Sequence, residues 1–158
     1  MSLSQAQVDE RFMLNAIAVA HDATRQNEVP IGAIVVRGTS IIAAANNRTV
    51  RDQDATAHAE LIAIRDASAE LDSWRLDDCT IYVTLEPCAM CAGAIVLSRI
   101  KRVVFGAWDE KAGMAGSVGD LLRHQRLNHT PEVQAGVLAE ECAQMLTEFF
   151  ESRRVPTT

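Results

Sequence analysis

Two cysteines three residues apart, Cys88 and Cys91, are the side chains whose spacing points most directly to chemistry. They follow Pro87, which suits the first position of a helix because its missing N–H group would have no partner there. Within one helical turn the two thiols share a face and can reach one ion. The helix dipole and its free N–H groups favour the thiolate form, which is the form that zinc binds. The motif therefore predicts two ligands of a zinc ion.

A second motif, His58-Ala59-Glu60, supplies what the cysteine pair lacks. His58, near the start of an earlier predicted helix, is the candidate for a third ligand. Three protein ligands leave the fourth tetrahedral position to water, which is typical of catalytic zinc sites. Two thiolates and a neutral imidazole balance the charge of the ion, which can lower the pKa of its bound water. Glu60 is then the candidate proton carrier, and one Zn²⁺ ion per protomer is expected.

The four cysteines also allow other interpretations. An isolated Cys-x-x-Cys could be a redox pair, but that interpretation leaves His58-Ala59-Glu60 unexplained. A structural zinc site would need a fourth ligand, and the remaining histidines have no evident ligand spacing. A disulfide framework is disfavoured in a cytosolic chain because the cytosol keeps thiols reduced. Cys79 and Cys142 are predicted to be small buried side chains.

Periodic apolar positions predict the elements that must position these motifs. Helical spacing marks an amphipathic helix at each end of the chain, and two short apolar runs around a turn predict a hairpin. The predicted helices are 7–25, 57–71, 87–97 and one beginning at Leu138, and the predicted strands are 31–36, 41–45, 80–85, 102–107 and 133–137. A glycine-rich connection over 109–129 is expected to contain a short helix around Leu121.

The alternation of strands and helices predicts the fold class. A strand–helix–strand–helix–strand order implies parallel neighbouring strands, right-handed crossovers and helices on both faces of the sheet. We expect an α/β protein, a three-layer α/β/α sandwich with a central mixed sheet of about five strands. No repeat or linker divides the 158 residues, so a single domain over 1–158 is predicted. The helix at 87–97 is apolar on every side, which suits burial or a subunit interface.

Composition and charge bound the class of protein. A hydrophobic fraction of 48% over 158 residues supports one real core. No apolar run is long enough to cross a bilayer and the N-terminus lacks the pattern of a signal peptide, so a cytoplasmic protein with no membrane partner is predicted. The net charge is −6, but the segment 98–126 has six basic and three acidic residues, a balance of +3. A basic face for nucleic acid and a solvated mixed-charge surface both fit this distribution.

The two motifs occur within longer segments that resemble one family. His-Ala-Glu followed by Pro-Cys-x-x-Cys is the signature of zinc nucleobase deaminases. The chain resembles the bacterial tRNA-specific adenosine deaminases of the cytidine/deoxycytidylate deaminase superfamily, over about residues 12–154. The segments that carry the resemblance are EVPIG (28–32), NNR (46–48), DATAHAE (54–60), YVTLEPCAMCAG (82–93), VVFGA (103–107), GS (116–117) and NH (128–129).

The resemblance implies a cytidine-deaminase-like fold, a homodimer, and adenosine at the wobble position of an arginine tRNA anticodon as the substrate. Zinc-activated water would attack C6 of adenine while Glu60 shuttles protons, giving inosine. Residues two apart in a helix diverge, so the resemblance, and not the spacing, places His58 and Glu60 at one site. The implied substrate-binding residues are Asn47 and Ala59 at the base, Val29 and Pro30 as pocket walls, Asp109, and Phe149, Arg153 and Arg154 at the anticodon loop.

Two departures from the family pattern and two rival functions stay open. Ala55 stands where the family usually has proline, which is expected to loosen that loop. Trp108 could stack on a base or pack against the end of the sheet or a neighbouring subunit. A deaminase of the same superfamily acting on free guanine, cytosine or a nucleoside would share the catalytic motifs. A non-catalytic zinc- and RNA-binding subunit would have no use for Glu60.

Overall fold

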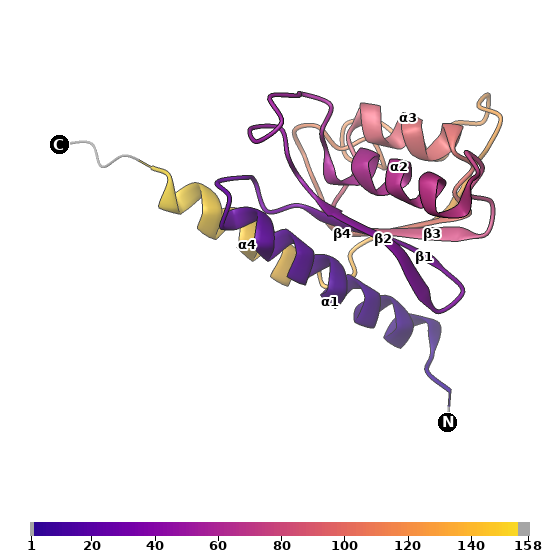
Figure 1. Cartoon of the computed structure of the whole chain (residues 1–158), viewed down its shortest axis with the longest axis horizontal. Coiled ribbons are helices and arrows are strands. Elements are labelled where there is room, and N and C mark those ends of the chain that lie inside the picture. Colours follow the sequence, from indigo (N-terminus) through magenta and orange to yellow (C-terminus); the bar gives the residue numbers. More distant parts are fainter. Residues whose placement is uncertain (1, 155–158) are drawn as a thin grey trace.

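The computed structural model of the chain describes residues 2–154, which form helices around one five-stranded sheet (Figure 1). The first helix begins earlier than its apolar periodicity predicts because Ser4 and Gln7 form a capping box. Gln7 N donates to Ser4 Oγ at 3.2 Å, and Ser4 N donates to Gln7 Oε1 at 2.9 Å. The elements in chain order are α1 (Gln5–Thr24), β1 (Gly32–Arg37), β2 (Ser40–Asn46), α2 (Ala59–Leu71), β3 (Cys79–Leu85), α3 (Ala89–Leu97), β4 (Arg102–Ala107), β5 (Glu132–Gln134) and α4 (Ala139–Ser152).

The sheet is mixed, as predicted, and its strand order is β2-β1-β3-β4-β5. β1 pairs antiparallel with both β2 and β3, whereas β3, β4 and β5 are parallel. The predicted parallel neighbours are β3, β4 and β5, and α3 joins the first two of them. The β1–β2 hairpin places β1 between β2 and β3, so α2 connects two parallel strands that are not adjacent.

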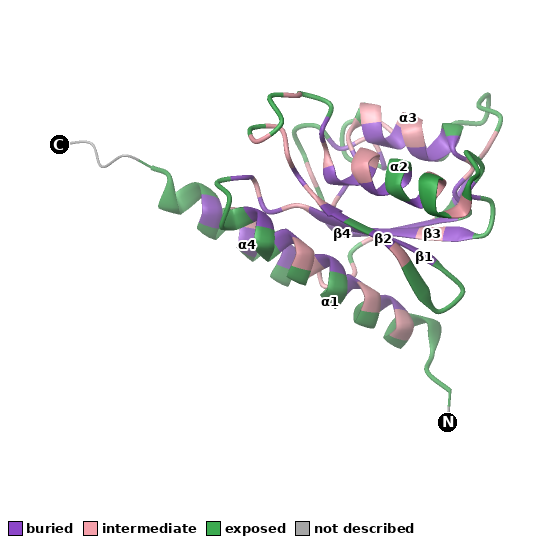
Figure 2. Ribbon diagram, viewed as in Figure 1, coloured by how far each residue is buried: buried purple, intermediate pink, exposed green. Residues whose placement is uncertain are grey.

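Helices cover both faces of the sheet, which confirms the three-layer α/β/α fold (Figures 1 and 2). α2 and α3 lie on one face, and α1 and α4 lie on the other. Side chains of neighbouring residues alternate between the two faces. Val35, Ile81 and Val103 join the core under α2 and α3, whereas Ile34 and Val104 join the core under α1 and α4. Within residues 2–154, no helix is long and apolar enough to span a bilayer.

The connection between β4 and β5 contains turns where a short helix around Leu121 was expected. Its backbone hydrogen bonds run across the loop instead of along a helix: Gly116 N donates to Gly119 O at 2.9 Å, and Leu121 N donates to Met114 O at 2.9 Å. Leu122 is fully buried although it belongs to no helix. The last strand is also shorter than predicted, ending at Gln134, because Gly136 takes a left-handed conformation with φ of 79°.

A buried ion pair joins α1 to the start of β4. Asp9 accepts two hydrogen bonds from Arg102, at 2.7 and 2.8 Å, and one from the Tyr82 hydroxyl at 2.9 Å. Asp9 is only 2% exposed. Burial alone would raise the pKa of Asp9, but the hydrogen bonds from Arg102, Tyr82 and Gln5 hold it below its usual value. The pair therefore stabilises the folded chain while Asp9 is ionised.

We expect Asp9→Asn to destabilise the protein by about 3–5 kcal/mol at neutral pH, because Arg102 keeps a buried charge without its main partner. A lowered folded-state pKa contributes stability above the ordinary carboxyl pKa, and this contribution disappears as the pH falls toward the lowered value. Urea unfolding of both proteins should show the largest difference at pH 7 and a narrowing difference below about pH 5. A difference that widens on acidification would contradict this role of Asp9.

Candidate active site

The N-termini of α2 and α3 bring the two sequence motifs together. His58 is the N-cap residue of α2 and Cys88 is the N-cap residue of α3, both with extended backbone conformations. Cys91 lies in the first turn of α3. The helix therefore begins at Ala89, two residues later than predicted, and Pro87 lies in the connection from β3. Since α2 and α3 lie side by side on one face of the sheet, both positive helix ends are available to thiolates.

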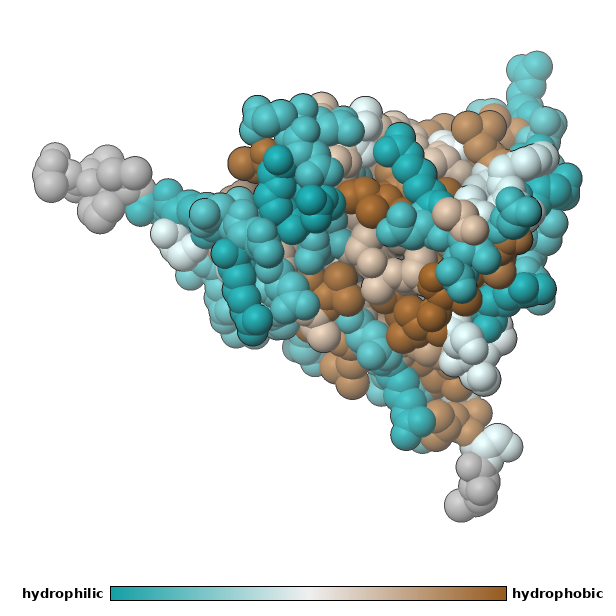
Figure 3. Space-filling view, in the orientation of Figure 1, coloured by the Kyte–Doolittle hydropathy of each residue, from teal (hydrophilic) through white to brown (hydrophobic). Residues whose placement is uncertain are grey.

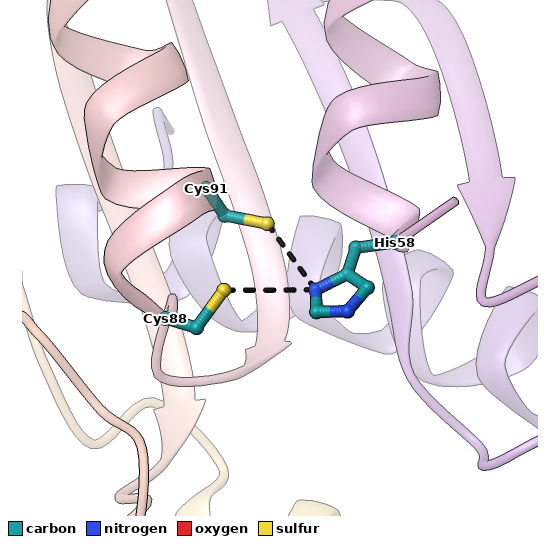
Figure 4. A group of neighbouring side chains, drawn as sticks. All are labelled: His58, Cys88 and Cys91. Carbon is teal, nitrogen blue, oxygen red and sulfur yellow. Dashed lines mark hydrogen bonds between the residues drawn. The ribbon is translucent and has the colours of Figure 1, made fainter. Parts of the chain in front are cut away.

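The three candidate ligand atoms have the separations that a tetrahedral zinc ion requires (Figure 4). His58 Nδ1 lies 3.6 Å from Cys88 Sγ and 3.5 Å from Cys91 Sγ, and all three atoms lie within 4.8 Å of one another. Zinc bonds of about 2.3 Å to sulfur and about 2.0–2.1 Å to nitrogen, at tetrahedral angles, separate a sulfur and a nitrogen ligand by about 3.5–3.6 Å. The group therefore fits a zinc ion.

The hydrogen bonds within the cluster favour the thiolate form of Cys88. A hydrogen bond from Cys91, and a further one from His58, lower the pKa of Cys88 to about 4, although burial opposes the change. The hydrogen bond to Cys88 and burial raise the pKa of Cys91. The hydrogen bond to Cys88 also raises the pKa of His58. The surrounding hydrogen bonds therefore favour the thiolate form of Cys88, which is the form that binds a metal ion.

Glu60 lies beside this cluster, in the first turn of α2, and is 4% exposed. Burial raises the pKa of Glu60 to about 7, against the opposing effects of a backbone hydrogen bond and of His58. The structure explains how residues two apart reach one site: His58 precedes the helix with ψ of 151°, so the helical divergence of positions 58 and 60 does not apply. A buried carboxyl that titrates near neutral pH can both accept and donate a proton.

Two further buried carboxylates, which the motifs did not single out, support loops beside the site. Glu28 is 1% exposed and accepts hydrogen bonds from Arg51 N at 2.6 Å and Val50 N at 3.3 Å. Asn47, itself 5% exposed, directs its Nδ2 toward Glu28 and Thr49 at 3.4 Å each. Glu86 binds the loop that begins at Asp109. Glu28 and Glu86 occur in the family-like segments 28–32 and 82–93, which was the available signal.

A groove of about 510 Å³ lies next to the candidate pocket walls. Trp108 is half-exposed, and its indole ring packs edge-on against Phe105 with ring centroids 5.0 Å apart. Packing at the end of the sheet, one of the two interpretations of Trp108, is thus confirmed, and stacking on a base stays a prediction for its exposed part. The groove is lined by apolar and charged side chains that include Val29, Leu85, Trp108, Asp109, Lys111 and Phe150.

The predicted RNA-contacting residues at the end of α4 differ in their exposure to solvent. Phe149 is buried, and the Arg153 guanidinium lies over its ring, 3.6 Å from the centroid. Arg153 also donates to Asn27 Oδ1 at 3.1 Å, just before the predicted wall residues Val29 and Pro30. Arg154 is exposed. Arg153 and Arg154, together with the exposed Phe150, therefore form the accessible surface at this end of α4.

The basic segment 98–126 does not form one continuous face for RNA. Arg102 is buried against Asp9, and it lies at the opposite end of β4 from Trp108 and Asp109. Arg123 pairs with Asp120 at 2.7 Å. Counting Arg102 among the basic RNA-binding candidates was therefore wrong, because the folded chain already uses its charge. Lys111 is the basic residue of this segment that lines the groove.

Hydrogen bonds from Thr56 to the Asp54 side chain stabilise the loop in which Ala55 replaces the usual proline. Asp54 Oδ1 accepts from Thr56 N at 2.8 Å and from Thr56 Oγ1 at 2.6 Å, which forms a local turn immediately before His58. A further bond from Ala57 N to Asp54 O at 3.1 Å closes the same turn. The expected loosening at Ala55 is thus offset by Asp54, and the backbone that leads to His58 is supported.

Comparisons with known proteins agree with this geometry. The family model described as MafB19-like deaminase matches residues 7–154. The chain is 51% identical to a tRNA-specific adenosine deaminase of Bacillus subtilis (strain 168), over 92% of this chain and 91% of that protein. A solved tRNA:A34 deaminase, studied for A-to-I editing at the wobble position of transfer RNA, has a TM-score of 0.83 and 42% identity over 86% of this chain and 99% of its own. A guanine deaminase from Nitrosomonas europaea has a TM-score of 0.78 and 25% identity over 89% and 83%.

Removal of any one of the three candidate ligands should abolish metal retention. We expect Cys88→Ser, Cys91→Ser and His58→Ala to lose bound zinc on purification, because two ligands hold the ion too weakly. The matched control is Cys79→Ser, a buried cysteine at the start of β3 outside the cluster. Elemental analysis by mass spectrometry should give about one zinc per protomer for the control and much less for the three variants. Equal zinc content in all four proteins would contradict the ligand assignment.

Proposed function

The chain belongs to the tRNA-specific adenosine deaminases, and we propose on that basis that its His58/Glu60/Cys88/Cys91 site hydrolyses adenosine to inosine at the wobble position of a tRNA anticodon. The observation that carries the proposal is the buried Glu60 beside a three-ligand group with zinc geometry. A purely structural zinc site has no need of such a carboxyl. The substrate we propose is an arginine tRNA, and the enzyme acts in the cytoplasm as one deaminase domain.

The proposed chemistry assigns a separate task to each part of the site. His58, Cys88 and Cys91 would hold one zinc ion per protomer, and the ion would lower the pKa of a bound water molecule so that it can attack at neutral pH. Glu60 takes a proton from the nucleophile and returns it to the departing amine, so that adenosine and water give inosine and ammonia. Asn47 and the backbone of Ala59 hold the base, and Val29 and Pro30 wall the pocket.

The proposed tRNA contacts lie around the groove and the end of α4. Lys111 offers a charge to phosphate, and Phe150 and Trp108 offer aromatic surface to splayed bases. Asp109, Phe149, Arg153 and Arg154 complete the proposed contacts, with Phe149 acting through the guanidinium that lies over its ring. A protein of net charge −6 attracts phosphate weakly at long range, so binding depends on this local surface and on the bases.

The decisive experiment compares RNA with free substrates. We expect zinc-loaded enzyme to deaminate an RNA stem-loop with an arginine anticodon and adenosine at the wobble position, and to leave free adenosine and guanine largely unchanged.

Glu60→Gln keeps the shape of the side chain and the zinc ligands, so it should retain zinc and RNA binding but lose about 10²–10⁴-fold in turnover. Inosine is read by sequencing and ammonia by a coupled assay.

Faster turnover of guanine than of the stem-loop would instead support the function of the guanine deaminase neighbours. Full zinc content and RNA binding with no ammonia release by the wild-type protein would support a non-catalytic RNA-binding subunit. Activity of Glu60→Gln within a few-fold of wild type would remove the role proposed for Glu60.

We also propose that two copies of the chain associate through the outer surface of α2 and α3. α3 buries Cys91, Ile95 and Val96 but leaves Leu97 71% exposed, and Trp74 nearby is 63% exposed. A shallow groove of about 430 Å³ between them is lined mainly by apolar side chains from both helices. Apolar side chains also reach the surface along the edge strand β2 and the adjoining flank of α2 (Figure 3). A second copy would remove this apolar surface from water.

Leu97→Glu should shift the protein from dimer toward monomer at micromolar concentration, because it places a charge within the proposed interface. Leu14→Glu is the matched control, since Leu14 is 57% exposed but lies on α1, on the other face of the sheet. Light scattering should give a dimer mass for the wild type and the control. A monomeric wild type with full activity, or equal dissociation of both variants, would contradict the proposed interface.

A further inference from the structure

Glu86 is a fully enclosed carboxylate that accepts four hydrogen bonds from a single loop. Its oxygens accept from Asp109 N at 2.9 Å, Ala115 N at 2.9 Å, Ser117 N at 3.0 Å and Ser117 Oγ at 2.5 Å. Glu86 is 2% exposed. All four donors are neutral groups between residues 109 and 117, a segment named here the substrate loop because its first residues line the groove. Such a set of bonds fixes the shape of the whole loop around one side chain.

The same residue is tied to the sheet and to the zinc ligands. Glu86 N donates to Ala107 O at 2.8 Å, which extends the pairing of β3 with β4 by one residue. Glu86 is followed by Pro87 and Cys88, and Pro87 O accepts from Met114 N at 2.8 Å. The turn that presents Cys88 and the substrate loop thus contact each other at both Glu86 and Pro87. A displacement of Glu86 would change the position of the loop relative to the metal site.

Gly113 provides the space that Glu86 occupies. A Cβ atom at position 113 would lie 2.2 Å from the Glu86 carboxyl carbon and 2.3 and 2.5 Å from its two oxygens. These separations are too short for non-bonded atoms, so any larger residue must displace the carboxylate or the loop. Its backbone conformation is not left-handed, so the close approach alone accounts for the need for glycine here.

We propose that Glu86 is a positioning residue that keeps the substrate loop in register with the Cys88–Cys91 turn and thereby sets the affinity for the RNA substrate. The proposal rests on the function proposed above, but the loop geometry itself does not. A glutamine at position 86 has one acceptor oxygen and directs an NH₂ group at backbone N–H donors. It therefore leaves buried donors unsatisfied and should release the loop without removing a zinc ligand.

The test compares Glu86→Gln and Gly113→Ala in the full-length, zinc-loaded protein. We expect each variant to raise KM for the anticodon stem-loop about tenfold while kcat stays within a few-fold and zinc content is unchanged. Ser117→Ala removes one of four donors and should raise KM less than either variant. The double variant should be no worse than the more affected single variant, because both changes break the same contact.

Hydrogen exchange supplies a readout that does not depend on activity. The amides of Asp109, Ala115 and Ser117 should exchange faster in Glu86→Gln and in Gly113→Ala than in the wild type. Asp9→Asn is the matched control: it removes a buried carboxylate at the opposite end of β4, so it should lower stability without altering loop exchange or KM.

Unchanged KM and loop exchange in Glu86→Gln, with a stability loss like that of Asp9→Asn, would overturn the proposal, as would loss of zinc. If the wild-type protein does not deaminate the stem-loop, the function proposed above fails. Loop exchange and stem-loop binding by fluorescence anisotropy would still decide the role of Glu86.

Discussion

The site depends on one geometric constraint, which is that two helix N-termini must meet at the same edge of the sheet. The three candidate ligand atoms, at the N-termini of two helices, lie within 4.8 Å of one another only because α2 and α3 run side by side over the same face. The antiparallel β1 makes this possible, since its place between β2 and β3 sets the path of the crossover through α2. The rest of the fold follows from that arrangement: α1 and α4 cover the opposite face and the two loops beside the ligands complete the pocket.

Much of this fold could be predicted because apolar periodicity reflects burial of each element on the sheet. The sequence indicated the three layers, the mixed sheet and the approximate bounds of α2, β3 and β4, since each has a regular buried pattern. It could not indicate strand order, because pairing of β1 with β3 joins residues far apart in the chain. The turns around Leu121 could not be predicted from apolar periodicity, because Leu122 is buried there without belonging to a helix.

The cysteine pair could be predicted from its spacing as candidate zinc ligands, but the residues around it could not. Cys88 and Cys91 are three residues apart, an interval typical of metal-binding cysteine pairs, whereas His58 and Glu60 required knowledge of where the helix begins. Glu28 and Glu86 resemble surface acids in the sequence, and their burial depends on loops folding back over them. Arg102 is the converse case, since a residue counted as a free positive charge is paired inside the protein. Net charge by segment therefore overstated the basic surface.

Glu60 and Glu86 show how the hydrogen-bond donors around a buried carboxyl group set its pKa. Both carboxyl groups are buried, and burial alone raises the pKa of each. At Glu86 the hydrogen bonds from Ser117 and from the amides of Asp109 and Ala115 outweigh burial, so its pKa falls below the usual value and it stays a fixed anion. Glu60 has fewer such donors, and its pKa rises to about 7. Two buried glutamates can therefore differ in protonation near neutral pH, because the hydrogen-bond donors directed at Glu86 offset its burial and those at Glu60 do not.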